Sequence, residues 1–133
     1  MMKFSSLLDE TAMNYESSVE FLSETTSGVK FRVKRITFGR RLELTRRVRE
    51  IARRIEFADS GTGFTDKVEA SLLSMEVDRL YLEWGLESIT GLTLDGAPAS
   101  VVDTIERGPE ELCREMVEAI RRECGLTEEE RKN

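Results

Sequence analysis

The sequence predicts a mainly α-helical domain of the α+β class, built from three or four helices and an N-terminal β-hairpin. Two observations support this prediction: apolar residues alternate with charged ones near the N-terminus, and apolar residues recur at helical spacing further along. At 133 residues the chain fits one domain with a single core. We expect a partly ordered N-terminal segment over 1–18, a single domain over 19–125 with its β-hairpin at 19–37, and an acidic tail over 126–133.

The hairpin is predicted from two short β-prone runs joined by a turn. Residues 19–24 form the first run, and residues 29–36 alternate Val or Phe with Lys or Arg, which is typical of a half-buried strand. Gly28 supplies the positive φ that tight hairpin connections require. Glu20 and Glu24 are expected to face the basic row of the returning strand.

Two long helices are predicted to follow, over 40–58 and from Lys67 to about Ser88. Asp66 is the expected N-terminal cap of the second helix, after a Gly-Thr-Gly loop at 61–63. That second helix carries apolar residues on more than one face, so we expect it to be the central, most buried helix. The first helix has one apolar stripe, formed by Leu44, Val48, Ile51, Ile55 and Ala58.

The C-terminal third contains clear turn and cap signals. Asp-Gly at 95–96 predicts a tight turn, and Ser100 opens a short helix that Gly108 closes. Pro109 suits the first turn of a last helix, which Gly125 ends. Its predicted inward stripe consists of Leu112, Met116, Ala119 and Ile120.

Charge is strongly segregated along the chain. Residues 30–54 contain eleven Lys or Arg and two Glu, a net charge of +9, whereas the whole chain carries −6. The remainder therefore carries −15. This separation indicates that the basic strand and helix face something anionic. The acidic pI of the whole chain, about 4.9, disfavours a general nucleic-acid binder but leaves the local basic stretch open.

Two interpretations of the basic helix stay open. Its arginines either form a solvated face that acidic helices of the same chain partly neutralise, or they dock an anionic partner through bidentate contacts. RNA or DNA is the less favoured partner, because aromatic residues for base stacking are few there. An acidic protein surface, including a second copy in head-to-tail association, fits better. The candidate partner-binding residues are Arg40, Arg41, Arg46, Arg47, Arg49, Arg53, Arg54 and Trp84.

Trp84 belongs to the segment Tyr81–Leu86, which also has two interpretations. Packing in the core at helical spacing is favoured, and an exposed aromatic patch that grips another protein is the alternative.

Catalytic chemistry is not predicted. The chain has no histidine, the commonest general base and metal ligand, and no phosphate-binding glycine loop. Cys113 and Cys124 lie eleven residues apart in one predicted helix, about 16 Å, which is too far for a disulfide. We therefore expect a protein that is not an enzyme and uses no cofactor or metal.

No apolar run approaches the roughly 20 residues of a membrane span, and the N-terminus lacks the apolar core of a signal peptide. The expected location is the cytoplasm.

Four segments of the chain carry a resemblance to a known class of proteins: FRVKRITFGRR at 31–41, YLEWGL at 81–86, GPEEL at 108–112 and the ending GLTEEERKN at 125–133. In these segments, and in the order of its elements from about Val19 to the end, the chain resembles small phage proteins of the tail assembly chaperone class, or phage tail-region proteins of unknown role.

This resemblance implies a non-enzymatic, mostly helical protein in the cytoplasm of a bacterium that carries a phage or prophage. Proteins of this class coat the tape measure protein during tail assembly and oligomerise around it. The leading hypothesis is therefore a tail assembly chaperone that binds a client tail protein and self-associates. The alternatives are a nucleic-acid-binding regulator that uses the helix over 40–58, and a structural component of the tail.

Overall fold

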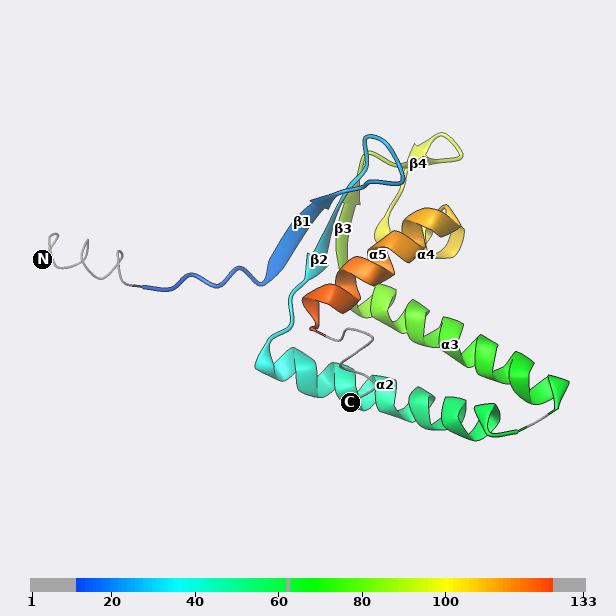
Figure 1. Ribbon diagram of the computed structural model, residues 1–133. Helices are drawn as coiled ribbons and strands as arrows, with labels where there is room; N and C mark the ends of the chain where they lie inside the picture. Colours follow the sequence, from blue (N-terminus) through cyan, green and yellow to red (C-terminus); the bar gives the residue numbers. More distant parts are fainter. Residues whose placement is uncertain (1–11, 62, 126–133) are drawn as a thin grey trace, which may run out of the picture.

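The computed structural model describes residues 12–61 and 63–125. In this part of the chain four helices and a three-stranded sheet form a mainly α domain of the α+β class, as predicted (Figure 1). The proposed acidic tail and most of the proposed N-terminal segment fall outside the described residues. The elements are β1 (Ser18–Leu22), β2 (Lys30–Lys34), α2 (Phe38–Asp59), α3 (Phe64–Gly85), β3 (Leu86–Thr90), β4 (Thr93–Leu94), β5 (Ala97–Pro98), α4 (Val101–Arg107) and α5 (Glu110–Glu123).

The predicted hairpin is present as β1 and β2. Glu20 lies opposite Arg32 and Phe21 opposite Phe31 in the antiparallel register, and the two phenylalanine rings stack with centroids 5.6 Å apart. Gly28 in the turn has φ +83°, the left-handed conformation that its position predicted.

The strand β3 was not predicted, and the helix predicted to continue to Ser88 ends at Gly85. β3 pairs antiparallel with β2, which places Ile89 opposite Phe31 and completes a sheet in the order β1-β2-β3. Gly91 follows β3 with φ +86°, and a Cβ atom there would lie 2.1 Å from the carbonyl oxygen of Gly28. The end of β3 therefore approaches the turn of the hairpin closely, which only glycine permits.

The core lies between the sheet and α5, which crosses one face of the sheet (Figure 1). Phe31 and Val33 of β2 are buried there, together with the predicted inward stripe of α5. The α4 and α5 boundaries also follow the prediction: the Ser100 hydroxyl accepts a hydrogen bond from the Asp103 N–H at 3.1 Å, and Gly108 caps the C-terminal end of α4. Short strands β4 and β5 surround the predicted turn at 95–96.

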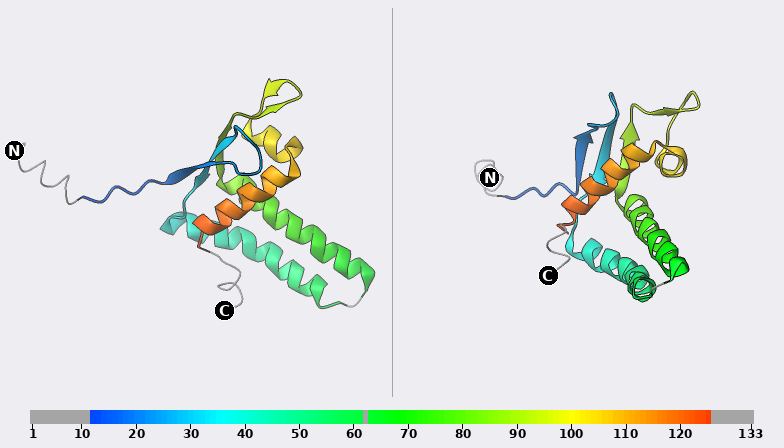
Figure 2. Two further views of the ribbon diagram at one scale, coloured as in Figure 1. Left: turned by 45° about the horizontal axis from the view of Figure 1, so that its top comes forward. Right: turned by 45° about the vertical axis from the view of Figure 1, so that its right-hand side comes forward.

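The helices α2 and α3 form a long antiparallel hairpin that extends beyond the rest of the domain, and the two views of Figure 2 show this projection from different sides. The loop between them is the far end of the hairpin. α3 begins at Phe64, so Asp66 lies in its first turn and not at the cap position, where Gly63 makes no side-chain hydrogen bond. A carboxylate in the first turn still stabilises the positive end of the helix dipole.

Candidate partner-binding surface

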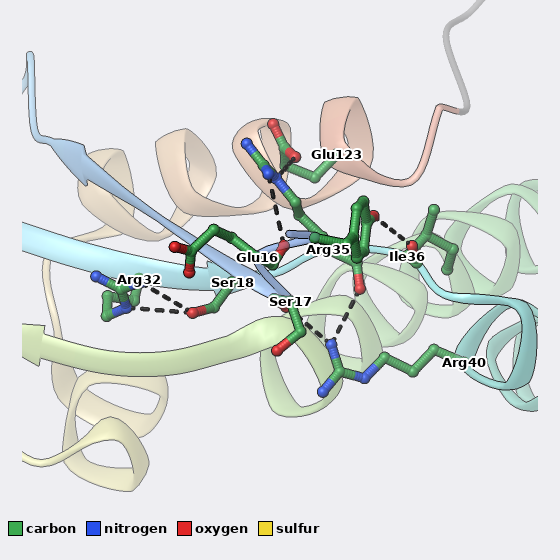
Figure 3. A network of polar contacts seen from close by, with 9 residues as sticks. Glu16, Ser17, Ser18, Arg32, Arg35, Ile36, Arg40 and Glu123 are labelled. Carbon is green, nitrogen blue, oxygen red and sulfur yellow. Dashed lines mark hydrogen bonds and ion pairs between the residues drawn. The ribbon is translucent and has the colours of Figure 1, made fainter. Parts of the chain in front are cut away.

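The arginines of β2 and of the segment that follows it are neutralised within the chain. Arg32 lies 3.7 Å from carboxylate oxygens of both Glu20 and Glu87, on the two neighbouring strands. Arg35 pairs with Glu123 of α5 at 3.2 Å (Figure 3). This half of the basic stretch is therefore part of the structure of the domain.

Arg40 and Arg41 are bound to backbone carbonyl groups. Arg40 Nη1 donates to the Ser17 oxygen at 2.9 Å and to the Arg35 oxygen at 3.1 Å (Figure 3). Arg41 Nη2 donates to the Cys124 oxygen at 3.0 Å, at the C-terminal end of α5. Both side chains fix the start of α2 to the body of the domain, so they are structural residues in this arrangement.

The remaining arginines of α2 differ from these two. Arg47 makes an exposed contact with Glu43 of the same helix at 3.8 Å, an interaction that contributes little in water. Four exposed arginines form no ion pair or hydrogen bond with any part of the chain that the structure describes. These four, Arg46, Arg49, Arg53 and Arg54, are called the basic face below.

Exposed apolar residues stand at both ends of the basic face. Leu42 precedes it and Phe57, which is 84% exposed, follows it. From Leu42, the residues Arg46, Arg49, Arg53 and Phe57 recur at steps of four, three, four and four, so they lie along one side of α2. At its edges, Arg49 borders a pocket with Tyr81 and Cys124, and Arg53 and Phe57 border a hollow with α3. A row of unpaired cations with apolar ends is suited to docking a partner that carries carboxylates and apolar side chains.

Trp84 is not part of this surface. Only 5% of it is exposed, and it belongs to the buried core, as the packing interpretation predicted. The neighbouring Gly85 lets α3 approach α5, because a Cβ atom at this position would lie 2.7 Å from Cγ2 of Ile120.

The second feature of the surface was missed in the sequence, where α3 was predicted to be the most buried helix. Its outer side carries exposed apolar residues along the half that lies towards the far end of the hairpin, and these are called the apolar stripe below. They are Phe64, Val68, Leu72 and Met75. These residues recur at helical spacing on the side of α3 opposite the buried Leu73, Val77 and Tyr81. The sequence therefore contains a second apolar stripe, which was predicted to lie in the core.

The apolar stripe leads into a groove of about 400 Å³ between α3, α4 and α5, whose floor includes Leu82 and Val117. Asp78 at its edge pairs with Arg121 at 2.7 Å. Glu76 at the same edge pairs with no described residue. Counted over whole helices, α3 has five acidic and two basic residues, a net charge of −3, whereas α2 has seven arginines and four acidic residues, a net charge of +3.

The cysteines offer no activated nucleophile. Burial is the main cause that raises the pKa of Cys124 to about 11, and burial also raises the pKa of Cys113, with the Glu110 carboxylate adding to it. A raised pKa lowers the fraction of reactive thiolate. Residues 12–61 and 63–125 contain no group of three Cys, Asp or Glu placed to hold a metal ion.

Comparisons with known proteins show no relationship: no family model, no curated protein and no solved structure matches the chain. None of the described helices is both long and apolar enough to cross a lipid bilayer.

Proposed function

We propose that this protein is a tail assembly chaperone of a phage or prophage, which binds a client tail protein in the bacterial cytoplasm and self-associates. The observation that carries the proposal is the basic face of α2, whose four arginines pair with no residue of 12–61 or 63–125, on a projecting helical hairpin. The resemblance of segments 31–41 and 81–86 to that class directs the choice of client, the tape measure protein.

The chemistry of the surface specifies the client segment. A helix that carries Asp or Glu beside an apolar stripe would pair its carboxylates with Arg46, Arg49 and Arg53 and its apolar side chains with Leu42 and Phe57. A guanidinium group binds a carboxylate at two points, so a row of arginines also fixes the register of a bound helix.

The test is co-purification of the tagged protein with a fragment of the tape measure protein encoded in the same genome. We expect capture by the wild type, and loss of capture in the triple variant Arg46→Glu, Arg49→Glu, Arg53→Glu. Arg122→Glu is the matched control, because Arg122 is an exposed arginine of α5 and not a member of the basic face. A wild-type protein that does not retain the fragment at low salt would refute the proposal.

A nucleic-acid-binding regulator is the second candidate, and the unpaired row of arginines is the observation in its favour. Asp66 and Glu69 line the same hollow as Arg53 and Arg54 at the far end of the hairpin, and their charge would repel a phosphate backbone. A gel shift that weakens steeply with salt and disappears in the triple variant would establish this candidate in place of the first. A structural tail component, the third possibility, would be found by mass spectrometry of purified particles.

A further inference from the structure

The outer side of α3 at the far end of the hairpin has no covering element among the described residues. α5 contacts α3 at Asp78, which pairs with Arg121, and it borders the groove that Leu72 and Met75 also line. Beyond that point the apolar stripe is open, and Leu72 and Met75 are 52% and 65% exposed. Four apolar side chains on one free helix face predict a docking partner.

The acidic residues beside the stripe specify the charge of that partner. Glu76 lines the groove with Leu72 and Met75, and Glu69 lies on the flank of α3 that borders the hollow shared with α2. Neither carboxylate pairs with a described residue. A helix with apolar residues and unpaired cations on one side would complement this face. The outer side of α2, with Arg49, Arg53 and Phe57, has this composition.

We propose that the apolar stripe of α3 binds the outer side of α2 from a second copy of this chain. Within the hairpin, Arg54 and Phe57 lie level with Asp66 and Glu69, since they line one hollow. If a second copy lies beside the first at the same level, the Phe57 side chain of the second copy meets Phe64 and Val68 of the first. Its Arg53 then lies level with Glu69 of the first copy. The basic face and the apolar stripe then stack in the same antiparallel sense that α2 and α3 already have.

This contact is heterologous, because it joins two different surfaces. Each copy therefore presents one basic face and one apolar stripe, and the association extends as an open row unless the rotation between copies closes it into a ring. The inference rests on the proposed function in one respect: the client and a second copy compete for the same arginines.

The contact is expected to be weak. A single half-helix face is smaller than the roughly 1,200–2,000 Å² that stable specific interfaces bury. Its charged pairs are solvent-exposed, so salt weakens them. Association should therefore depend on protein concentration and decrease as ionic strength rises.

The test is sedimentation velocity of the full chain over a range of concentrations at low and high salt. One variant, Leu72→Glu with Met75→Glu, removes the apolar stripe and keeps the basic face. The other, Arg49→Glu with Arg53→Glu, reverses the charge of two of the four arginines of the basic face and keeps the stripe. The matched controls are Val102→Glu, an exposed apolar position on α4, and Arg122→Glu on α5.

We expect the wild type and both controls to associate and each double variant to be monomeric. The stripe variant should weaken association by at least about tenfold, since burial of one leucine side chain alone is worth that much. The arginine variant should weaken it by replacing attraction to the acidic residues of α3 with repulsion between like charges. A mixture of the two double variants retains one intact contact, so it should form a heterodimer and nothing larger. Circular dichroism of each variant verifies that its helices are intact.

Two results would overturn the inference: a wild type that stays monomeric at low salt up to millimolar concentration, or a mixture of double variants that forms no heterodimer. The proposed function is tested separately by the tape measure fragment. The stripe variant should still capture that fragment, so loss of self-association with retained capture separates the two ideas.

Discussion

A single carboxylate holds the turn between β1 and β2 against α5. Glu115 accepts hydrogen bonds from the Ser23 hydroxyl at 2.6 Å, the Glu24 N–H at 2.7 Å and the Thr25 hydroxyl at 2.8 Å. Partial burial on its own would raise the pKa of this carboxyl, but these hydrogen bonds together outweigh it and lower the pKa below its ordinary value of 4.5. Glu115 therefore stabilises the fold in its ionised form.

The substitution Glu115→Gln tests this role. We expect the free energy of unfolding to fall by about 1 kcal/mol at pH 7, because the hydrogen bonds lose their charge. A lowered carboxyl pKa gives stability that is complete above pH 4.5 and is lost as the pH falls below that value. Urea unfolding at pH 7 and pH 3.5 should show the difference between the two proteins shrinking at the lower pH. A constant difference would contradict the prediction.

The two cysteines should differ in reactivity. Cys124 is buried and has a thiol pKa of about 11, whereas Cys113 is only half-buried, and partial burial raises its pKa. We expect iodoacetamide at pH 8 to modify Cys113 first and Cys124 only after unfolding, since the thiolate is the reactive form. Mass spectrometry of a labelling time course measures both rates. Equal rates at the two sites in the native protein would contradict this expectation.

At the scale of elements, the contact between α3 and α5 depends on Gly85. An alanine Cβ would lie 2.7 Å from Ile120 Cγ2, so Gly85→Ala should destabilise the protein by about 1–3 kcal/mol through overpacking, despite the better helix propensity of alanine. Denaturant unfolding of the single variants and of the double variant Gly85→Ala with Ile120→Ala gives the coupling. We expect the double variant to be more stable than the sum of the single effects predicts.

The elements that the sequence predicts well are those whose signal is local. The inward-facing apolar residues of α2, the Ser100 cap and the Asp-Gly turn each depend on residues within a few positions of one another, and all three are present. β3 was missed because its register depends on pairing with β2, more than fifty residues earlier. The same limit affected α3: its two apolar stripes look alike in sequence, but only one of them meets another element.

For the molecule as a whole, the sequence predicts the sign of the surface but not the state of each arginine. The eight candidate residues separate in the structure into one buried aromatic residue, Trp84, two arginines bound to backbone carbonyl groups, one in a weak pair with Glu43, and the four of the basic face. Whether a cation is neutralised depends on which distant carboxylate or carbonyl group folds beside it. Seven arginines in one helix therefore predict a basic surface, but the tertiary contacts determine which of these arginines are free to bind a partner.

Hydrogen exchange should show how firmly the far end of the α2–α3 hairpin is held, and whether a second copy covers it. Among the described residues, the main contacts of its far end are those between α2 and α3, whereas β2 and α5 share the core. Backbone amides near residues 53–61 and 63–70 should therefore exchange with deuterium faster than those of α5. If a second copy covers this end, exchange in both α2 and α3 should slow as protein concentration rises, while exchange in α5 stays constant. Mass spectrometry of the exchanged peptides at two concentrations measures this.

The variant Leu72→Glu with Met75→Glu is the control for that measurement, because it retains the hairpin and removes the apolar stripe. Its exchange should not depend on concentration. Protection that appears in α3 but not in α2 would mean that copies meet through their stripes alone, an isologous contact in place of the head-to-tail one. The two arrangements thus predict protection in different peptides. Backbone amides of α2 become protected on association only if the basic face of one copy lies on the stripe of the next.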